Sequence, residues 1–124
     1  MRIKWANVLP VLSVSIAALI GASCGKERDA ARPMTEGERL SLVAGCTSCH
    51  GPNGEGGVGP KWVGLYGSTV TLADGSKVVA DDTYLTTAIK DPSAQPVKGY
   101  IAMPPNALGD DDVAKIVEFI KSLK

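Results

Sequence analysis

Residues 45–51 read GCTSCHG, and the interpretation of the rest of the chain depends on them. It contains Cys-x-x-Cys-His, the attachment signal for a c-type haem. Two thiols three positions apart lie on one helical turn, where each can add to one vinyl group of a haem. The imidazole of His50 then points at the iron from the face that the two thioether bonds fix. The motif therefore predicts one covalently bound haem c on Cys46, Cys49 and His50.

Two other chemistries use the same residue types. A Cys-x-x-Cys pair can be a redox dithiol, but that interpretation requires a strand–helix–strand setting, and the residues before Cys46 predict a helix. A structural zinc site requires four ligands, and only Cys46, Cys49 and His50 cluster here. Both chemistries stay open as alternatives to haem.

Composition narrows the function classes. The chain has 124 residues, which favours one domain, and its 13 basic residues balance 13 acidic ones. Nucleic-acid binding requires a basic patch, so we expect no nucleic-acid partner. The aromatic residues are only two Trp, three Tyr and one Phe. A rigid apolar haem would help so short a chain to form a core, as metals and disulfides do in other small scaffolds.

Residues 1–23 are interpreted as a secretory signal of the lipoprotein type. Arg2 and Lys4 precede an apolar run, and small residues follow it. The run is short for a bilayer span, which needs about 20 residues, and Pro10 interrupts it. We therefore expect export from the cytoplasm.

Cys24 follows these small residues as in the lipobox of bacterial lipoproteins, except that Gly21 stands where that box usually carries Leu. We expect Cys24 to carry lipid and to attach the protein to the periplasmic face of a membrane. A free cysteine near an ordinary cleavage site, or an uncleaved anchor, remains open, as does a soluble periplasmic protein. Residues 24–33 are interpreted as a polar tether of at most about 30 Å, and residues 34–124 as the folded domain.

The domain begins with a predicted helix. Thr35 and Glu38 fit a capping box, and Leu40, Val43 and Ala44 would then share one face of a helix that runs into the haem motif. Gly37 has two interpretations. It either permits close approach of another helix, or it is a tolerated first-turn residue that costs up to about 1 kcal/mol relative to Ala.

The middle of the domain combines a glycine-rich loop, bulky side chains and a hairpin. Residues 51–60 predict the loop, and residues 70–79 alternate about Asp-Gly, which predicts the hairpin. Between them, Trp62, Leu65 and Tyr66 are expected to line the haem pocket.

Two further helices are predicted toward the carboxyl end. Residues 83–90 form the first, which Asp91-Pro92 would end. Residues 109–112 open the second, whose acidic start suits the helix dipole. Its apolar stripe, expected to pack on the helix before Cys46, comprises Val113, Ile116, Val117, Ile120 and Leu123.

Met103 is the candidate for the second axial ligand. The chain has a single His, which excludes two histidine ligands to one haem. Met1 lies in the signal and Met34 at the edge of the domain, whereas Met103 precedes two prolines well after the haem motif. A Met is more often core filler than a ligand, but an iron atom here has a sixth position to fill.

With these residues in place, the chain resembles a class I cytochrome c over residues 34–124. The resemblance rests on the haem motif, on Gly59-Pro60, on residues 64–67, on Met103-Pro104 and on the terminal amphipathic helix. In its hairpin, its Tyr84-Leu85 helix and residues 98–105, it is most similar to the cytochrome c domain fused to subunit II of some bacterial haem–copper oxidases, whose copper-binding part is absent here.

The resemblance implies an all-α fold around a haem core, with the N- and C-terminal helices packed together and one peripheral β-hairpin. It also implies that His50 and Met103 are the axial ligands. The Pro60 carbonyl would accept a hydrogen bond from the His50 ring. Ser68 stands where some relatives carry an Arg near a haem propionate, so Trp62 and Tyr66 become candidates for that contact.

The expected function is one-electron transfer in a bacterial respiratory chain, because His/Met ligation raises the iron potential. The donor would be a quinol-oxidising complex or a dehydrogenase, and the acceptor a terminal oxidase or reductase. We expect no enzymatic turnover, since no catalytic base, nucleophile or substrate pocket is evident. A permanently bound haem c subunit of a respiratory complex, and an open-site haem enzyme or gas sensor, remain as alternatives.

Overall fold

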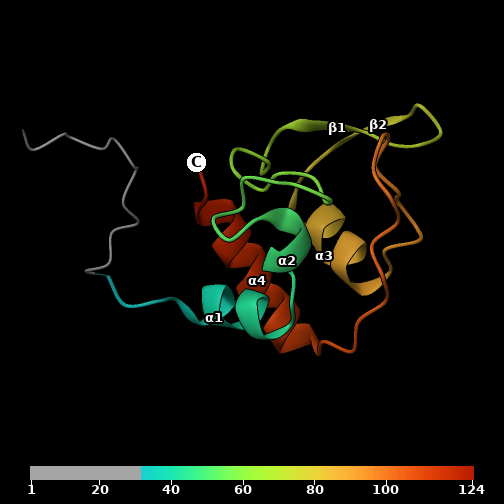
Figure 1. Ribbon diagram of the computed structural model, residues 1–124. Helices are drawn as coiled ribbons and strands as arrows, with labels where there is room; N and C mark the ends of the chain where they lie inside the picture. The colour runs from blue at the N-terminus through green and yellow to red at the C-terminus, as the bar shows by residue number, and fades with distance from the viewer. Residues whose placement is uncertain (1–31) are drawn as a thin grey trace, which may run out of the picture. The chain divides into compact units, whose positions relative to one another are not determined.

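The computed structural model describes residues 32–124. The predicted signal, Cys24 and residues 24–31 of the tether lie outside the described residues. The described part contains four helices and a two-stranded antiparallel sheet (Figure 1). In chain order the elements are α1 (Glu36–Val43), α2 (Thr47–His50), β1 (Thr69–Thr71), β2 (Lys77–Val79), α3 (Asp82–Lys90) and α4 (Asp110–Ser122).

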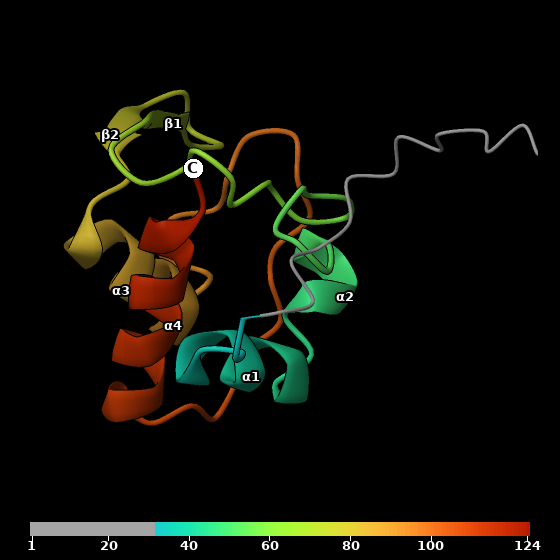
Figure 2. The ribbon, with the colours of Figure 1, turned by 90° about the vertical axis from the view of Figure 1, so that its left-hand side faces the viewer.

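Helix α4 lies at the centre of the hydrophobic core. It contacts both α1 and α3, and two views a quarter-turn apart show α1 crossing it and α3 running beside it (Figures 1 and 2). The predicted apolar stripe is buried except for Leu123, which is half-buried. Phe119, which is not part of the predicted stripe, is buried with it. Burial of such side chains stabilises the fold by roughly 1.5–3 kcal/mol each.

The buried face of α1 differs from the predicted one except at Leu40, which is half-buried against the core. Val43 is 76% exposed and Ala44 is also exposed, whereas Gly37 and Ser41 are buried. Thr35 caps the helix as predicted, its side chain accepting a hydrogen bond from the Glu38 amide. The face is made of small residues because α1 and α4 approach closely. An added Cβ on Gly37 would lie 2.0 Å from the Lys115 carbonyl oxygen.

The chain also breaks between α1 and the haem motif, where a single continuous helix was expected. Gly45 adopts a φ of 75°, a left-handed conformation that ends α1 and that glycine adopts readily. The short α2 then begins, and the His50 amide donates to the Cys46 carbonyl at 3.0 Å. This break turns the haem motif away from α1 and toward a pocket.

The predicted hairpin forms and does more than border the fold. Val70 pairs with Val78 across β1 and β2, and Gly75 adopts a φ of 87° in the turn. Beyond the strands, the Lys98 amide donates to the Thr71 carbonyl at 3.0 Å. The hairpin therefore holds the start of the long segment that leads to Met103.

Candidate functional site

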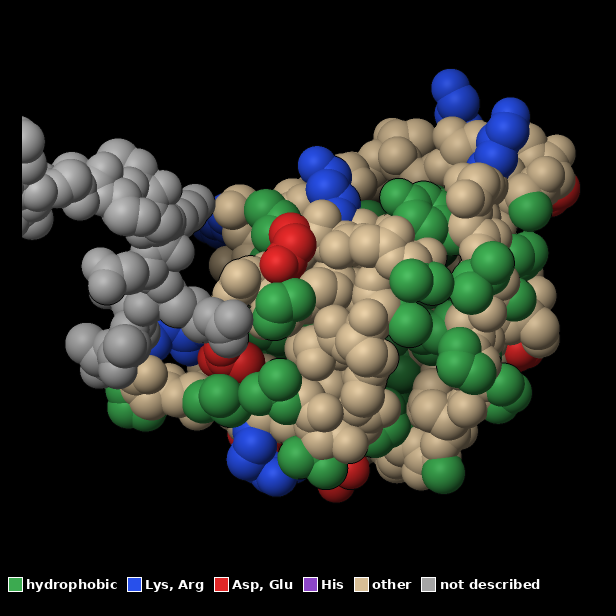
Figure 3. Space-filling view, in the orientation of Figure 1, with side chains coloured by type: hydrophobic (Ala, Val, Ile, Leu, Met, Phe, Trp, Pro, Cys, Tyr) green, Lys and Arg blue, Asp and Glu red, His purple; other side chains and the backbone are tan. Residues whose placement is uncertain are grey.

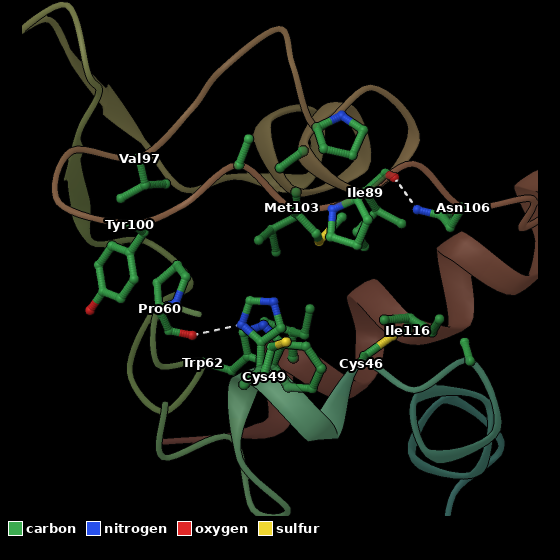
Figure 4. Close-up of a pocket in the computed structure, with 18 of the residues that line it drawn as sticks. Cys46, Cys49, Pro60, Trp62, Ile89, Val97, Tyr100, Met103, Asn106 and Ile116 are labelled. Atoms are coloured by element: carbon green, nitrogen blue, oxygen red, sulfur yellow. Dashed lines mark hydrogen bonds between the residues drawn. The ribbon is translucent and has the colours of Figure 1, made fainter. Parts of the chain in front are cut away.

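A pocket of about 250 Å³ lies between α2 and the segment that precedes α4. Cys46, Cys49 and His50 line it on the α2 side, and Met103 reaches into it from the opposite segment (Figure 4). Trp62 and Leu65, both predicted pocket residues, also line it. None of the described residues that line it is charged. The structure thus brings together the two thiols, the imidazole and the thioether that the sequence singled out.

The His50 ring is held on several sides. Its Nδ1 lies 2.7 Å from the Pro60 carbonyl oxygen, the contact that the resemblance implied. Because a carbonyl oxygen only accepts, Nδ1–H donates and the lone pair of Nε2 stays free for a metal. Burial lowers the pKa of His50, while the hydrogen bond to Pro60 acts in the opposite direction. The ring is therefore oriented and favours the neutral form that ligates iron.

Two neighbours fix the plane of this ring. The Trp62 ring stacks on it, with ring centroids 4.6 Å apart and planes 20° from parallel. Phe119 contacts the indole in an edge-on arrangement, at a centroid distance of 6.2 Å. At Gly59, an added Cβ would lie 2.9 Å from the His50 Cε1 atom. Gly59 and Trp62 therefore act as positioning residues for the imidazole.

Replacing Trp62 with leucine is expected to destabilise the fold by about 1–3 kcal/mol, because it removes a buried ring and leaves a cavity. It should also raise the reduction potential modestly, since the electron-rich indole face favours the more positive imidazole of the oxidised state. Denaturant titration and voltammetry would measure the two effects. Trp62→Phe retains a stacked ring and should keep most of the parent stability and the parent potential. An unchanged reduction potential in Trp62→Leu would contradict the proposed effect of the indole on the potential.

Cys46 and Cys49 are half-buried, unpaired thiols. Burial raises the pKa of the Cys46 thiol, so this sulfur remains protonated near neutral pH and is a weak nucleophile by itself. Both sulfurs sit in the wall that carries His50, beside an apolar cavity. Paired thiols, an imidazole with one free nitrogen and a thioether across the cavity together fit a haem.

Met103 belongs to an irregular segment that is anchored beyond it. The side chain is half-buried, and Pro104 and Pro105 follow it. Asn106 then donates from Nδ2 to the Ile89 carbonyl at 2.6 Å (Figure 4). Its Oδ1 accepts from the Leu108 amide at 3.2 Å. Sequence reasoning missed Asn106, although an Asn between a Pro-Pro pair and a helix start is a recognisable turn signal.

Asn106→Ala is expected to loosen the Met103 segment without unfolding the protein. The Ile89 carbonyl loses its partner, which should cost about 1–2 kcal/mol of stability. The methionine–ferric iron absorption band should weaken, and added imidazole or cyanide should bind faster. Val79→Ala, an exposed change on β2, serves as the control for stability. An Asn106→Ala protein with the parent band and ligand-binding rate would contradict an anchoring role.

The prediction that Tyr66 lines the pocket is wrong, because Tyr66 is not among the residues around it. Its side chain is 41% exposed, and its hydroxyl lies 3.4 Å from Asp82 at the start of α3. The Lys121 amine sits 5.0 Å from the centre of the ring and bonds Glu118 at 2.8 Å and Asp82 at 2.9 Å. These bonds, to Glu118 first and then to Asp82, raise the pKa of Lys121. Tyr66 thus belongs to a surface cluster that joins α4 to α3.

Comparison with known proteins gives one result. Residues 34–124 match the family model described as Cytochrome c. No match is found among curated proteins. The matched range begins just before α1 and contains every element of the described structure.

Proposed function

Because the chain belongs to the cytochrome c family, whose members carry a covalently bound haem c, we propose that it is a one-electron carrier with a single haem. The observation that supports this best is the arrangement of His50 and Met103. Their side chains enter one uncharged pocket from opposite walls. A site with both axial positions filled favours electron transfer over chemistry on a bound substrate.

Each site residue then has a role. Cys46 and Cys49 would hold the haem covalently through their sulfurs, and His50 and Met103 would ligate its iron. The Pro60 carbonyl holds the imidazole through Nδ1–H, and Trp62 and Leu65 enclose the pocket. Bound haem supplies the one-electron couple. The protein keeps both ligands in place and excludes water, so that little rearranges when the charge changes.

We also propose a place in a bacterial respiratory chain. The donor is a quinol-oxidising complex or a soluble dehydrogenase, and the acceptor is a terminal oxidase or reductase. Likeness of residues 98–105 to the cytochrome domain fused to oxidase subunit II supports this context. Copurification separates a carrier from a permanently bound subunit, because a carrier leaves the complex with detergent and salt.

Export and a lipid anchor at Cys24 complete the proposal. Every helix within residues 32–124 is too short or too polar to span a bilayer. The support for the anchor is the sequence before Cys24, and mass spectrometry of the membrane-bound protein tests it. An unmodified Cys24 thiol would contradict it.

Reduced-minus-oxidised spectroscopy with a potentiometric titration tests the central proposal. We expect a low-spin haem c spectrum, a single reversible one-electron wave and a methionine–ferric iron band. A colourless protein after export with intact maturation machinery would contradict the haem assignment. A coloured protein that binds carbon monoxide or cyanide rapidly would instead favour an open-site enzyme or sensor.

A further inference from the structure

The residues that line the pocket and the smaller cavity at its mouth carry no charged side chain. Residues 40–54 and 99–109 supply α2 and the Met103 segment, and they contain no Asp, Glu, Lys or Arg. All 13 basic and all 13 acidic residues of the chain lie outside these two segments. Figure 3 shows hydrophobic side chains around the hollow, with Lys and Arg side chains toward the margins of that face and acidic side chains also visible on it.

Two aliphatic side chains stand exposed at this mouth. Val58 is 55% exposed and Ile101 is 74% exposed. They come from different loops, yet both line one small cavity together with Cys49 and Met103. They therefore flank the same opening, next to one thioether position and one axial ligand. Exposed aliphatic residues that gather at an opening often mark an interaction site.

The charge pattern restricts what can dock there. A partner with a charged face would lose the hydration of its charges against Val58 and Ile101 and gain no opposite charge in return. The charged residues nearest to the two in sequence, Glu55, Lys61 and Lys98, have mixed signs. They provide no single-sign field for steering.

We propose that Val58 and Ile101 form a docking face for a redox protein whose own contact face is uncharged and apolar. The proposal rests on the proposed electron-transfer function and names the class of its partner. Docking by apolar contact alone should be weak and brief, at the small end of protein interfaces. Its rate should depend little on ionic strength.

Electron self-exchange provides the test, because it brings two such faces together with the protein as its own probe. The full-length holoprotein, kept in solution by a non-ionic detergent, is studied as mixtures of its oxidised and reduced forms. Broadening of the haem methyl resonances gives the rate constant. We expect it to change less than about twofold when salt rises from about 0.01 M to about 0.5 M, a range over which charge interactions are strongly screened.

Matched lysine variants give the second arm. Ile101→Lys places like charges on both faces and should slow exchange about tenfold at low salt, with recovery at high salt. Val79→Lys adds the same charge at an exposed valine on β2 that does not line the pocket, and should change the rate less than about twofold. A tenfold salt dependence in the parent protein, or equal rates in the two variants, would overturn the proposal.

Two further readouts separate the possible failures. A parent protein that dimerises stably in sedimentation, and becomes monomeric in Ile101→Lys, would overturn transient docking in favour of a second copy. A parent protein without a reversible one-electron titration would overturn the carrier function together with the docking face. A normal titration with strongly salt-dependent exchange would overturn the docking face alone.

Discussion

Met103→Ala is expected to abolish the methionine–ferric iron band and to lower the reduction potential. The thioether is a weak donor that favours the reduced iron, and its removal opens one axial position. Axial ligands set haem potentials over about 0.8 V, so we expect a drop on the order of 0.1 V or more. Visible spectroscopy and voltammetry measure the two changes, and rapid binding of cyanide or carbon monoxide should accompany them.

The chain offers a matched control for this substitution. Met34 is 50% exposed just before α1 and does not line the pocket. Met34→Ala should therefore leave the band, the potential and the ligand-binding rate unchanged. If Met103→Ala keeps the parent band and potential, Met103 is not an axial ligand, and the assignment of a closed site is wrong.

Gly37→Ala is expected to destabilise the protein by about 3 kcal/mol or more, although alanine is the better helix former by about 1 kcal/mol. The new Cβ would meet the backbone carbonyl of Lys115 at 2.0 Å and the Phe119 Cβ at 2.8 Å. A backbone group cannot rotate out of the way, so α1 and α4 must separate. Denaturant unfolding of the holoprotein measures the loss.

The sign of this effect decides between the two interpretations of Gly37. A merely tolerated glycine would give a more stable alanine variant, which would contradict close helix packing. Gly109 provides the control, because its φ is −72° and no atom lies within 4 Å of an added Cβ. Gly109→Ala should cost no more than about 1 kcal/mol, the usual loss of a glycine N-cap.

Several features of the site and fold could be predicted because they are local. The haem motif is a chemical requirement on three side chains at fixed spacing. The Asp-Gly turn of the hairpin requires a positive φ, which Gly75 supplies. The 3.6-residue period of the apolar residues predicts the buried face of α4, because that face is built from large aliphatic residues.

The buried face of α1 could not be predicted from a hydrophobic period. Its contact with α4 depends on the absence of side-chain atoms at Gly37 and on the small Ser41, which no hydrophobic period reports. Val43 shares the apolar period with Leu40, yet it is exposed. Close packing selects for volume as well as for hydrophobicity.

The cofactor chemistry, the candidate ligands and the amphipathic helix follow from the order of the residues, because each depends on residues close together in the chain. The packing of the fold decided that Trp62 stacks on His50 while Tyr66 turns outward to Asp82. It also decided that Asn106 anchors the Met103 segment to α3, and that Val58 and Ile101 meet at one opening. These pairings join residues that are far apart in the chain, and their geometry is set by how the helices, the hairpin and the loops pack together.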